Sequence, residues 1–189
     1  MIKAIIFDCF GVLTTDMWRL FTAGLPENLL QPARDLNQQL DLGHIDYETF
    51  TRKIIELTGQ SPVEVERLKS SEIVKNGPLI SYIGVLKQHY KIGLLSNISS
   101  NWIQTSLLTA QEIMLFDDMI LSHQVGLIKP DPEIFKLTCR RLGVKPETAV
   151  LVDDIQNNCI AARAVGMQAI CYQDFAQFKT ELNALSSRS

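Results

Sequence analysis

The sequence predicts an α/β fold, a doubly wound parallel sheet that carries a small helical insertion. Short, continuous apolar runs occupy residues 3–7, 91–95, 118–121, 149–152 and 168–172. Such runs are typical of strands covered by helices on both faces, and the stretches between the later runs have helical periodicity. Residues 15–78 contain helical segments and no convincing strand. Strands alternating with helices, interrupted once by helices alone, indicate this fold class.

The first strand leads directly into the helical insertion. Its helices are separated by helix-breaking residues, namely Pro26, Pro32, Gly43, Gly59 and Pro62. We predict a core domain formed by residues 1–14 and 79–189, and a cap domain formed by residues 15–78. Ligands bind at the carboxyl ends of the strands in such sheets, so an insertion at this place could cover the site as a lid.

Two later helices have clear boundaries in the sequence. Asp131 and Pro132 suit the N-cap and the first position of a helix that ends at Gly143. A second helix is predicted over residues 156–165, ended by Gly166.

Length, charge and composition narrow the class of protein. The chain has 189 residues, a formal charge of −3 and no Lys/Arg-rich run, so neither nucleic acid nor a membrane surface is an expected partner. It lacks a signal-like apolar N-terminus and an apolar run of about 18 residues, and a cytoplasmic protein is expected. The four cysteines are widely spaced and are expected to be reduced.

Polar residues follow the first two predicted strands. Asp8 ends the first run and is followed by Gly11, which permits a tight turn. Ser96 and Asn97 end the second run. Taken alone, each of these is more typical of a turn or a helix cap than of a functional site.

Two further features carry charge. Lys129 stands ahead of Pro130 and Pro132, on a stiff segment that suits a cation aimed at developing negative charge. Asp153 and Asp154 are adjacent carboxylates at the end of the fourth run. Such a pair repels itself unless a cation lies between it and other ligands, so a metal site is predicted.

The four features occur in order, each at the carboxyl end of a predicted strand or in the loop that follows. A carboxylate nucleophile, a hydroxyl donor, a lysine and an acidic metal site would then meet on one edge of the sheet. Phosphoryl transfer depends on such positioning and charge neutralisation.

Here the sequence resembles the haloacid dehalogenase (HAD) superfamily, whose four motifs match Asp8, Ser96, Lys129 and the pair Asp153-Asp154 over nearly the whole chain. The phrases Lys-Pro-Asp-Pro-x-Ile-Phe, Val-Asp-Asp-x-x-x-Asn and Ala-Ala-Arg-Ala-Val-Gly-Met are typical of its phosphatase branch with a small helical cap. The phrase at residues 42–50 resembles sugar-phosphate phosphatases and the N-terminal domains of soluble epoxide hydrolases. The resemblance implies a Rossmann-like HAD core.

The resemblance also implies a mechanism and a cofactor, Mg²⁺. Asp8 would attack phosphorus to form an aspartyl-phosphate that water hydrolyses, while Ser96, Asn97 and Lys129 contact the substrate. The metal ligands would be Asp8, the backbone carbonyl of Phe10, Asp153 and Asp154. Asn158, with Asn97, would orient these groups from behind. The expected partner is a small phosphorylated metabolite, and the oligomeric state is open.

One position departs from the superfamily's pattern. Most of its phosphatases have a second Asp two residues after the nucleophile, as general acid and base, and this chain has Phe10. That function is worth about 10²- to 10⁴-fold in rate. A phosphatase could act on a good leaving group, or could recruit a replacement from solvent or from the cap, where the candidates are Asp16, His44, Asp46 and Glu48. The alternatives are a catalytically impaired protein that binds a phosphorylated ligand or a protein partner, and a haloacid dehalogenase, which needs no leaving-group acid.

Overall fold

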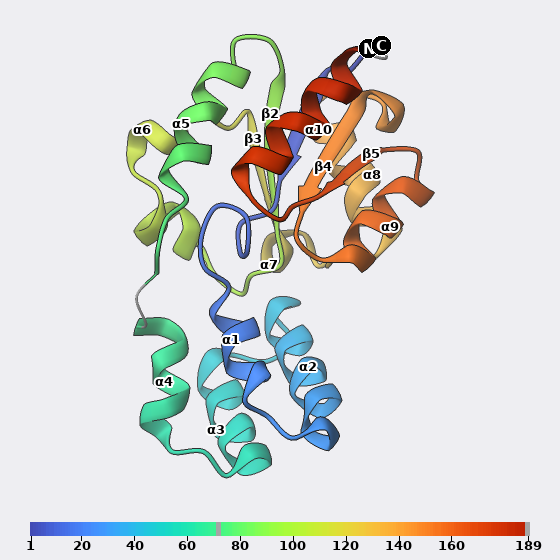
Figure 1. Cartoon of the computed structure of the whole chain (residues 1–189). Helices are drawn as coiled ribbons and strands as arrows, with labels where there is room; N and C mark the ends of the chain where they lie inside the picture. The colour runs from blue at the N-terminus through green and yellow to red at the C-terminus, as the bar shows by residue number, and fades with distance from the viewer. Residues whose placement is uncertain (71–72, 188–189) are drawn as a thin grey trace.

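The computed structural model describes residues 1–70 and 73–187. Its centre is a five-stranded parallel sheet in the order β3-β2-β1-β4-β5 (Figure 1). The strands are β1 Ala4–Phe7, β2 Lys91–Ser96, β3 Asp118–Leu121, β4 Ala149–Asp153 and β5 Gln168–Cys171. All five predicted strands are confirmed, each within one residue at either end.

The register of the sheet determines which polar residues meet. Phe7, the last residue of β1, pairs with Leu94 of β2 and with Val152 of β4. The segments that continue β1, β2 and β4 therefore leave the sheet at the same edge. This is the edge at which the sequence predicts the site.

Helices cover both faces of the sheet, which confirms the doubly wound architecture. On one face, apolar side chains of α5 and α10, such as Ile83 and Phe178, pack against Ile5 and Phe7. On the other face, α8 and α9 contribute Phe135 and Cys159. These helices are α5 Gly77–Leu86, α8 Pro132–Arg141, α9 Gln156–Ala164 and α10 Phe175–Ser187.

The helix boundaries predicted after the third strand are also confirmed. Asp131 caps α8, its side chain accepting a hydrogen bond from the Glu133 N–H at 2.8 Å. Gly143 follows the end of α8 with φ of +68°. Short elements complete the core: the π-helix η1 Ile103–Leu107, α6 Ala110–Ile113, α7 Ser122–Val125 and the 3₁₀-helix η2 Pro146–Thr148.

The predicted insertion consists of four helices that pack together beyond the carboxyl edge of the sheet (Figure 1). They are α1 Met17–Ala23, α2 Glu27–Asp41, α3 Tyr47–Thr58 and α4 Pro62–Ser70. They bury an apolar cluster of their own, made of Ala33, Leu40, Phe50, Ile54 and Val65. Trp18 and Phe21 pack against this cluster.

The expectation that Pro32 separates two helices is wrong, because α2 runs through it. A proline inside a helix leaves the carbonyl four residues earlier without a partner. Pro32 is exposed, so the freed carbonyl of Asn28 can be hydrated and the helix persists.

Two segments join the four helices to the rest of the chain, residues 13–15 and 74–76, and they pair with each other. The Asn76 N–H donates to the Leu13 carbonyl at 2.8 Å, and the Thr15 N–H donates to the Val74 carbonyl at 3.2 Å. We call these segments the linker pair. Asn76 also caps α5, which begins at Gly77, two residues before the predicted return to the core.

Within residues 1–70 and 73–187, no helix is both long enough and apolar enough to cross a bilayer.

Candidate active site

Asp8 lies at the carboxyl end of β1 and is almost fully buried, with 5% of its surface exposed. Its N–H donates to the Val152 carbonyl at 2.9 Å, which continues the pairing of β1 with β4. Its Oδ1 accepts hydrogen bonds from the Cys9 N–H at 2.6 Å and from the Lys129 ammonium, 2.7 Å away. Asp8 is therefore a buried part of the sheet edge and not an exposed turn residue.

Lys129 brings a buried positive charge between two carboxylates. Its Nζ lies 2.7 Å from Asp8 Oδ1 and 2.7 Å from Asp153 Oδ2. Burial lowers the pKa of Lys129, but the carboxylates of Asp153 and Asp8 outweigh burial and raise it above its usual range. The side chain is thus a permanent cation.

Asn97 positions this lysine through its main chain. The Asn97 Nδ2 donates to the Lys129 carbonyl at 3.0 Å, and the Lys129 N–H donates to Asn97 Oδ1 at 2.8 Å. The Lys129-Pro130 peptide bond is cis. Both ends of the Asn97 amide are thereby engaged, whereas the sequence suggested contact with substrate. No helix begins at Ser96 or Asn97 in the described chain, so neither residue is a helix cap.

Three carboxylates converge at the same edge. Asp8, Asp153 and Asp154 each offer an oxygen, and these oxygens lie within 4.8 Å of one another. Asn158 Nδ2 donates to both oxygens of Asp153, at 2.9 and 3.1 Å, and the Ile155 N–H donates to Oδ1 at 2.9 Å. Asp153 is thus held rigidly from behind, by Asn158 among others.

Asp154 has an unused oxygen. Its Oδ1 is buried and has no hydrogen-bond partner among the described residues, while its Oδ2 lies 3.3 Å from Arg19 Nη1 on α1. Burial, Asp153 and Asp16 raise the pKa of Asp154, and Lys129 and Arg19 oppose them. A buried carboxylate oxygen without a donor is costly, and a hard cation such as Mg²⁺ would satisfy it. The donor set therefore fits magnesium.

The turn after Asp8 is shaped around Asp154. Gly11 adopts φ of +80°, and a Cβ built on it would overlap the Asp154 carboxylate. The Gly11 N–H donates to the Thr14 carbonyl at 2.7 Å, which closes the turn. Only glycine permits both the backbone conformation and the close approach.

Ser96 is the last residue of β2 and is fully buried. Its Oγ finds no hydrogen-bond partner in the described part of the chain. Buried hydroxyls are normally paired, so this one is available to a ligand at the sheet edge.

Phe10, at the position of the usual second Asp, is half-buried. Its ring stacks on Trp102, with centroids 6.0 Å apart and planes at 16°. The side chain is used for packing and offers no group for proton transfer.

The acids and the histidine proposed as replacements lie at the start of α1 and at or just before the start of α3. Asp16 caps α1, accepting from the Arg19 N–H at 3.0 Å, and its charge acts on Asp154. Asp46 caps α3, accepting from the Thr49 N–H at 2.8 Å, and is exposed. His44 is exposed as well.

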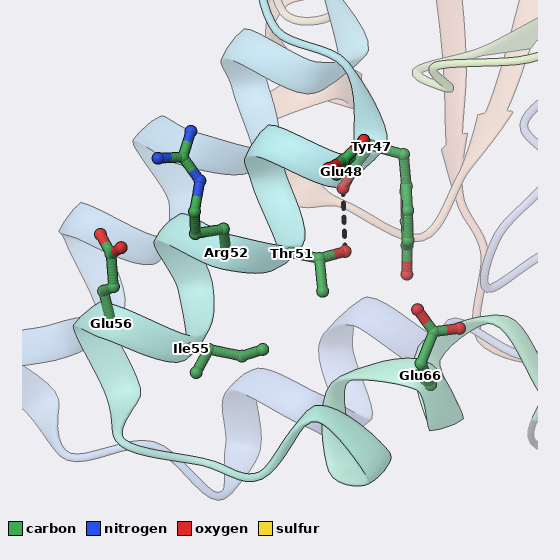
Figure 2. A pocket seen from close by; sticks show the side chains of 7 residues that line it. All are labelled: Tyr47, Glu48, Thr51, Arg52, Ile55, Glu56 and Glu66. Carbon is green, nitrogen blue, oxygen red and sulfur yellow. Dashed lines mark hydrogen bonds between the residues drawn. The ribbon is translucent and has the colours of Figure 1, made fainter.

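Glu48 faces a different hollow, between α3 and α4. Figure 2 shows this open pocket, which is lined by Tyr47, Glu48, Thr51, Arg52, Ile55, Glu56 and Glu66. All of these residues belong to the inserted helices, and none belongs to the cluster around Asp8.

Sequence reasoning missed Asp41, the last residue of α2. Burial raises its pKa to about 7, and the charge of Lys129 opposes this rise. An acid at a helix C-terminus is unfavourable with the helix dipole, and this was the available signal. Its position two residues before Gly43, which the sequence indicates as a helix breaker, could have drawn attention to it.

The chain belongs to the haloacid dehalogenase-like hydrolase family, whose model matches residues 2–166. It is a hydrolase, as the motifs predicted, and the family resemblance is confirmed.

Individual relatives share between a quarter and about a third of their aligned residues with this chain. A D-ribitol-5-phosphate phosphatase from Bacteroides thetaiotaomicron is 25% identical over 204 residues, which cover 98% of each chain. The bifunctional epoxide hydrolase 2 of Rattus norvegicus is 34% identical over 119 residues, 59% of this chain and 21% of that protein. The matched segment thus spans about a fifth of the rat protein's length.

Solved structures share the fold. A haloacid dehalogenase family enzyme from Bacteroides thetaiotaomicron, in complex with magnesium and inorganic phosphate, has a TM-score of 0.71 at 23% identity and covers 94% of this chain and 99% of its own. A 2-haloacid dehalogenase from Pseudomonas syringae has a TM-score of 0.59 at 20% identity, covering 91% and 86%. Because the fold is common to both, the site must distinguish the reactions.

Proposed function

We propose that this protein is a magnesium-dependent phosphatase that hydrolyses a small phosphate ester, of the sugar-phosphate class, through an aspartyl-phosphate on Asp8. One observation carries the proposal: the Lys129 ammonium lies between Asp8 and Asp153, at the sheet edge where Ser96 Oγ and Asp154 Oδ1 are buried without a hydrogen-bond partner among the described residues. This arrangement offers a nucleophile, two groups for phosphoryl oxygens and a cation site on one edge of the sheet.

The chain's residues would divide the work as follows. A carboxylate oxygen of Asp8 attacks phosphorus as the bond to the leaving oxygen breaks, and water later cleaves the new acyl phosphate. Lys129 and the Ser96 hydroxyl hold the phosphoryl oxygens and offset their charge. Asn97 keeps the lysine main chain in place and Asn158 holds Asp153.

The metal ligands in this proposal are the carboxylates of Asp8, Asp153 and Asp154 and the backbone carbonyl of Phe10. When bound, Mg²⁺ would neutralise negative charge on the phosphoryl group and orient it. The unpaired Oδ1 of Asp154 supports this assignment.

Two other readings make different predictions. A haloacid dehalogenase would use Asp8 on carbon and would need no metal, so the three clustered carboxylates, which suit a cation, argue against it. A catalytically impaired protein is suggested by Phe10, and it would bind phosphate without turnover.

The proposal is tested by measuring phosphate release from a panel of sugar phosphates and 4-nitrophenyl phosphate, with magnesium and with chelator. We expect release that requires magnesium and falls to background in Asp8→Asn. A matched control is Asp35→Asn, which changes an exposed acid on α2 and should be as active as the wild type.

Each alternative has its own result. Binding of phosphate without release of product would support the impaired protein. Halide release from a 2-haloacid without magnesium would support the dehalogenase.

A further inference from the structure

Asp41 is a titratable group that the proposed mechanism has not used. It ends α2, and its main chain lies against the sheet edge, because the Ser122 hydroxyl is shared between the Asp41 carbonyl at 2.7 Å and the Ile98 carbonyl at 2.9 Å. Ser122 directly follows β3, and its Oγ accepts from the Ile98 N–H at 2.8 Å. Ile98 is two residues beyond Ser96. The C-terminal end of α2 is thereby held beside the end of β3, at the sheet edge that carries the site.

The charge of Lys129 acts on this carboxyl group, which lowers its pKa against the effect of burial. Lys129 also contacts Asp8 directly. One ammonium therefore acts on both Asp8 and Asp41, although the two acids come from different parts of the chain. The neighbouring His123 is engaged elsewhere, with the Ile98 carbonyl at 3.0 Å and with Asn101 Oδ1 at 3.1 Å.

The hydrogen bonding of Asp41 leaves one oxygen for a ligand. Of the described residues, Asn37 alone donates to the carboxyl group, to Oδ2 at 2.9 Å. A proton on the group would then reside on Oδ1, which can donate it. With a pKa of about 7, raised by burial, the group is able both to give and to take a proton near neutral pH.

We propose that Asp41 is the general acid and base of this enzyme, and that it takes the role of the Asp that stands at the position of Phe10 in most phosphatases of the superfamily. The inference rests on the proposed phosphatase function. In the first step, an oxygen of Asp8 bonds to phosphorus while the ester bond breaks, and the proton of Asp41 passes to the leaving oxygen. In the second step, the water oxygen attacks phosphorus while the Asp41 carboxylate takes a proton from that water, and the bond between phosphorus and Asp8 breaks.

The test compares two leaving groups in wild type and Asp41→Asn. A sugar phosphate leaves as an alkoxide and needs the acid, whereas 4-nitrophenolate leaves without a proton. We expect Asp41→Asn to lower the single-turnover rate of aspartyl-phosphate formation by about 10²- to 10⁴-fold for the sugar phosphate and by less than about tenfold for 4-nitrophenyl phosphate. The second step loses its base with either substrate, so 4-nitrophenol should appear in a burst followed by a slow steady state in the variant. Asp35→Asn is the matched substitution on the same helix.

A rescue separates proton transfer from a structural role. Phe10→Asp in the Asp41→Asn background places an acid where the superfamily usually has one, and should restore at least about tenfold of the lost kcat for the sugar phosphate.

The outcomes are distinguishable. An active wild type with an unaffected Asp41→Asn overturns the inference and leaves the phosphatase standing. Equal losses for both substrates, with no burst and no rescue, assign Asp41 a structural role and also overturn it. No turnover of any ester by the wild type overturns the proposed function and this inference together.

Discussion

Lys129 is the residue on which the buried charges of the site depend. It is 4% exposed and contacts two carboxylates, so Lys129→Met leaves Asp8 and Asp153 buried without their cation. Breaking a buried ion pair in this way costs about 3–5 kcal/mol. We expect the free energy of unfolding in chelator, measured with urea, to fall by that amount.

The control for this prediction is Lys136→Met, which removes an exposed pair with Glu133 and should change stability by less than about 1 kcal/mol. Equal losses in the two variants would mean that the charge of Lys129 is not what stabilises the site.

Gly11 allows a second prediction at the scale of one residue. Gly11 and Gly59 both have positive φ, +80° and +68°, but only at Gly11 would a Cβ meet another side chain, the Asp154 carboxylate. Gly59→Ala should cost about 1–2 kcal/mol from backbone strain alone. Gly11→Ala should cost more and should also weaken magnesium binding, measured by calorimetry, because Asp154 must move. Unchanged magnesium affinity in Gly11→Ala would contradict this reading of the turn.

Most residues predicted from the sequence were those whose positions follow from strand ends. Asp8, Ser96, Asp153 and Asp154 lie at one edge because parallel strands present their carboxyl ends there. Lys129 lies in the loop before α8 and was indicated by its stiff proline-rich segment. Asp41 and Arg19 could not be found in this way. They reach the site from helices, and helix periodicity does not say how one helix packs against a distant strand end.

At the scale of elements, Asn76 connects a helix with a loop and with a strand end. Its Oδ1 accepts from the Leu79 N–H at 3.3 Å and caps α5, while its Nδ2 donates to the Val12 carbonyl at 2.9 Å and to the Tyr172 hydroxyl at 2.7 Å. Asn76→Ala removes all three bonds and should lower the free energy of unfolding by about 2–3 kcal/mol.

Asp131→Ala serves as the comparison, because its described cap is a single bond to the Glu133 N–H and should cost about 1 kcal/mol. If the two losses were equal, the bonds from Asn76 to Val12 and Tyr172 would contribute little.

The elements themselves were largely predictable. Continuous apolar runs marked every strand of the sheet, and Asp131 with Pro132 marked the start of α8. Pro32 was misleading, because a proline's effect on a helix depends on whether solvent can reach the carbonyl that it leaves unpaired. Exposure of that kind is a property of the packed molecule and is not readable from local sequence. The division into core and cap domains stays a prediction.

For the whole molecule, Asp41 predicts how stability depends on pH. Burial raises its pKa from the ordinary 3.8 to about 7, so between these values the folded chain holds a proton that the unfolded chain has released. Stability therefore falls as the pH rises from about 4 to about 7, because the unfolded state binds fewer protons. The difference in unfolding free energy between wild type and Asp41→Asn, measured in chelator across this range, should show that slope. A flat difference would mean that Asp41 ionises normally in the folded protein.

The linker pair has a consequence for how such proteins can diversify. The chain leaves the sheet at residues 13–15 and returns at residues 74–76, and the two segments are hydrogen-bonded to each other. Exit and return are neighbours, so the intervening segment can be exchanged for another without moving a strand. Recombination could thus replace the segment that contains Asp41 while Asp8, Asp153 and Asp154 at the strand ends stay unchanged. Substrate specificity and the proposed proton donor would then change together, because both lie in the replaced segment.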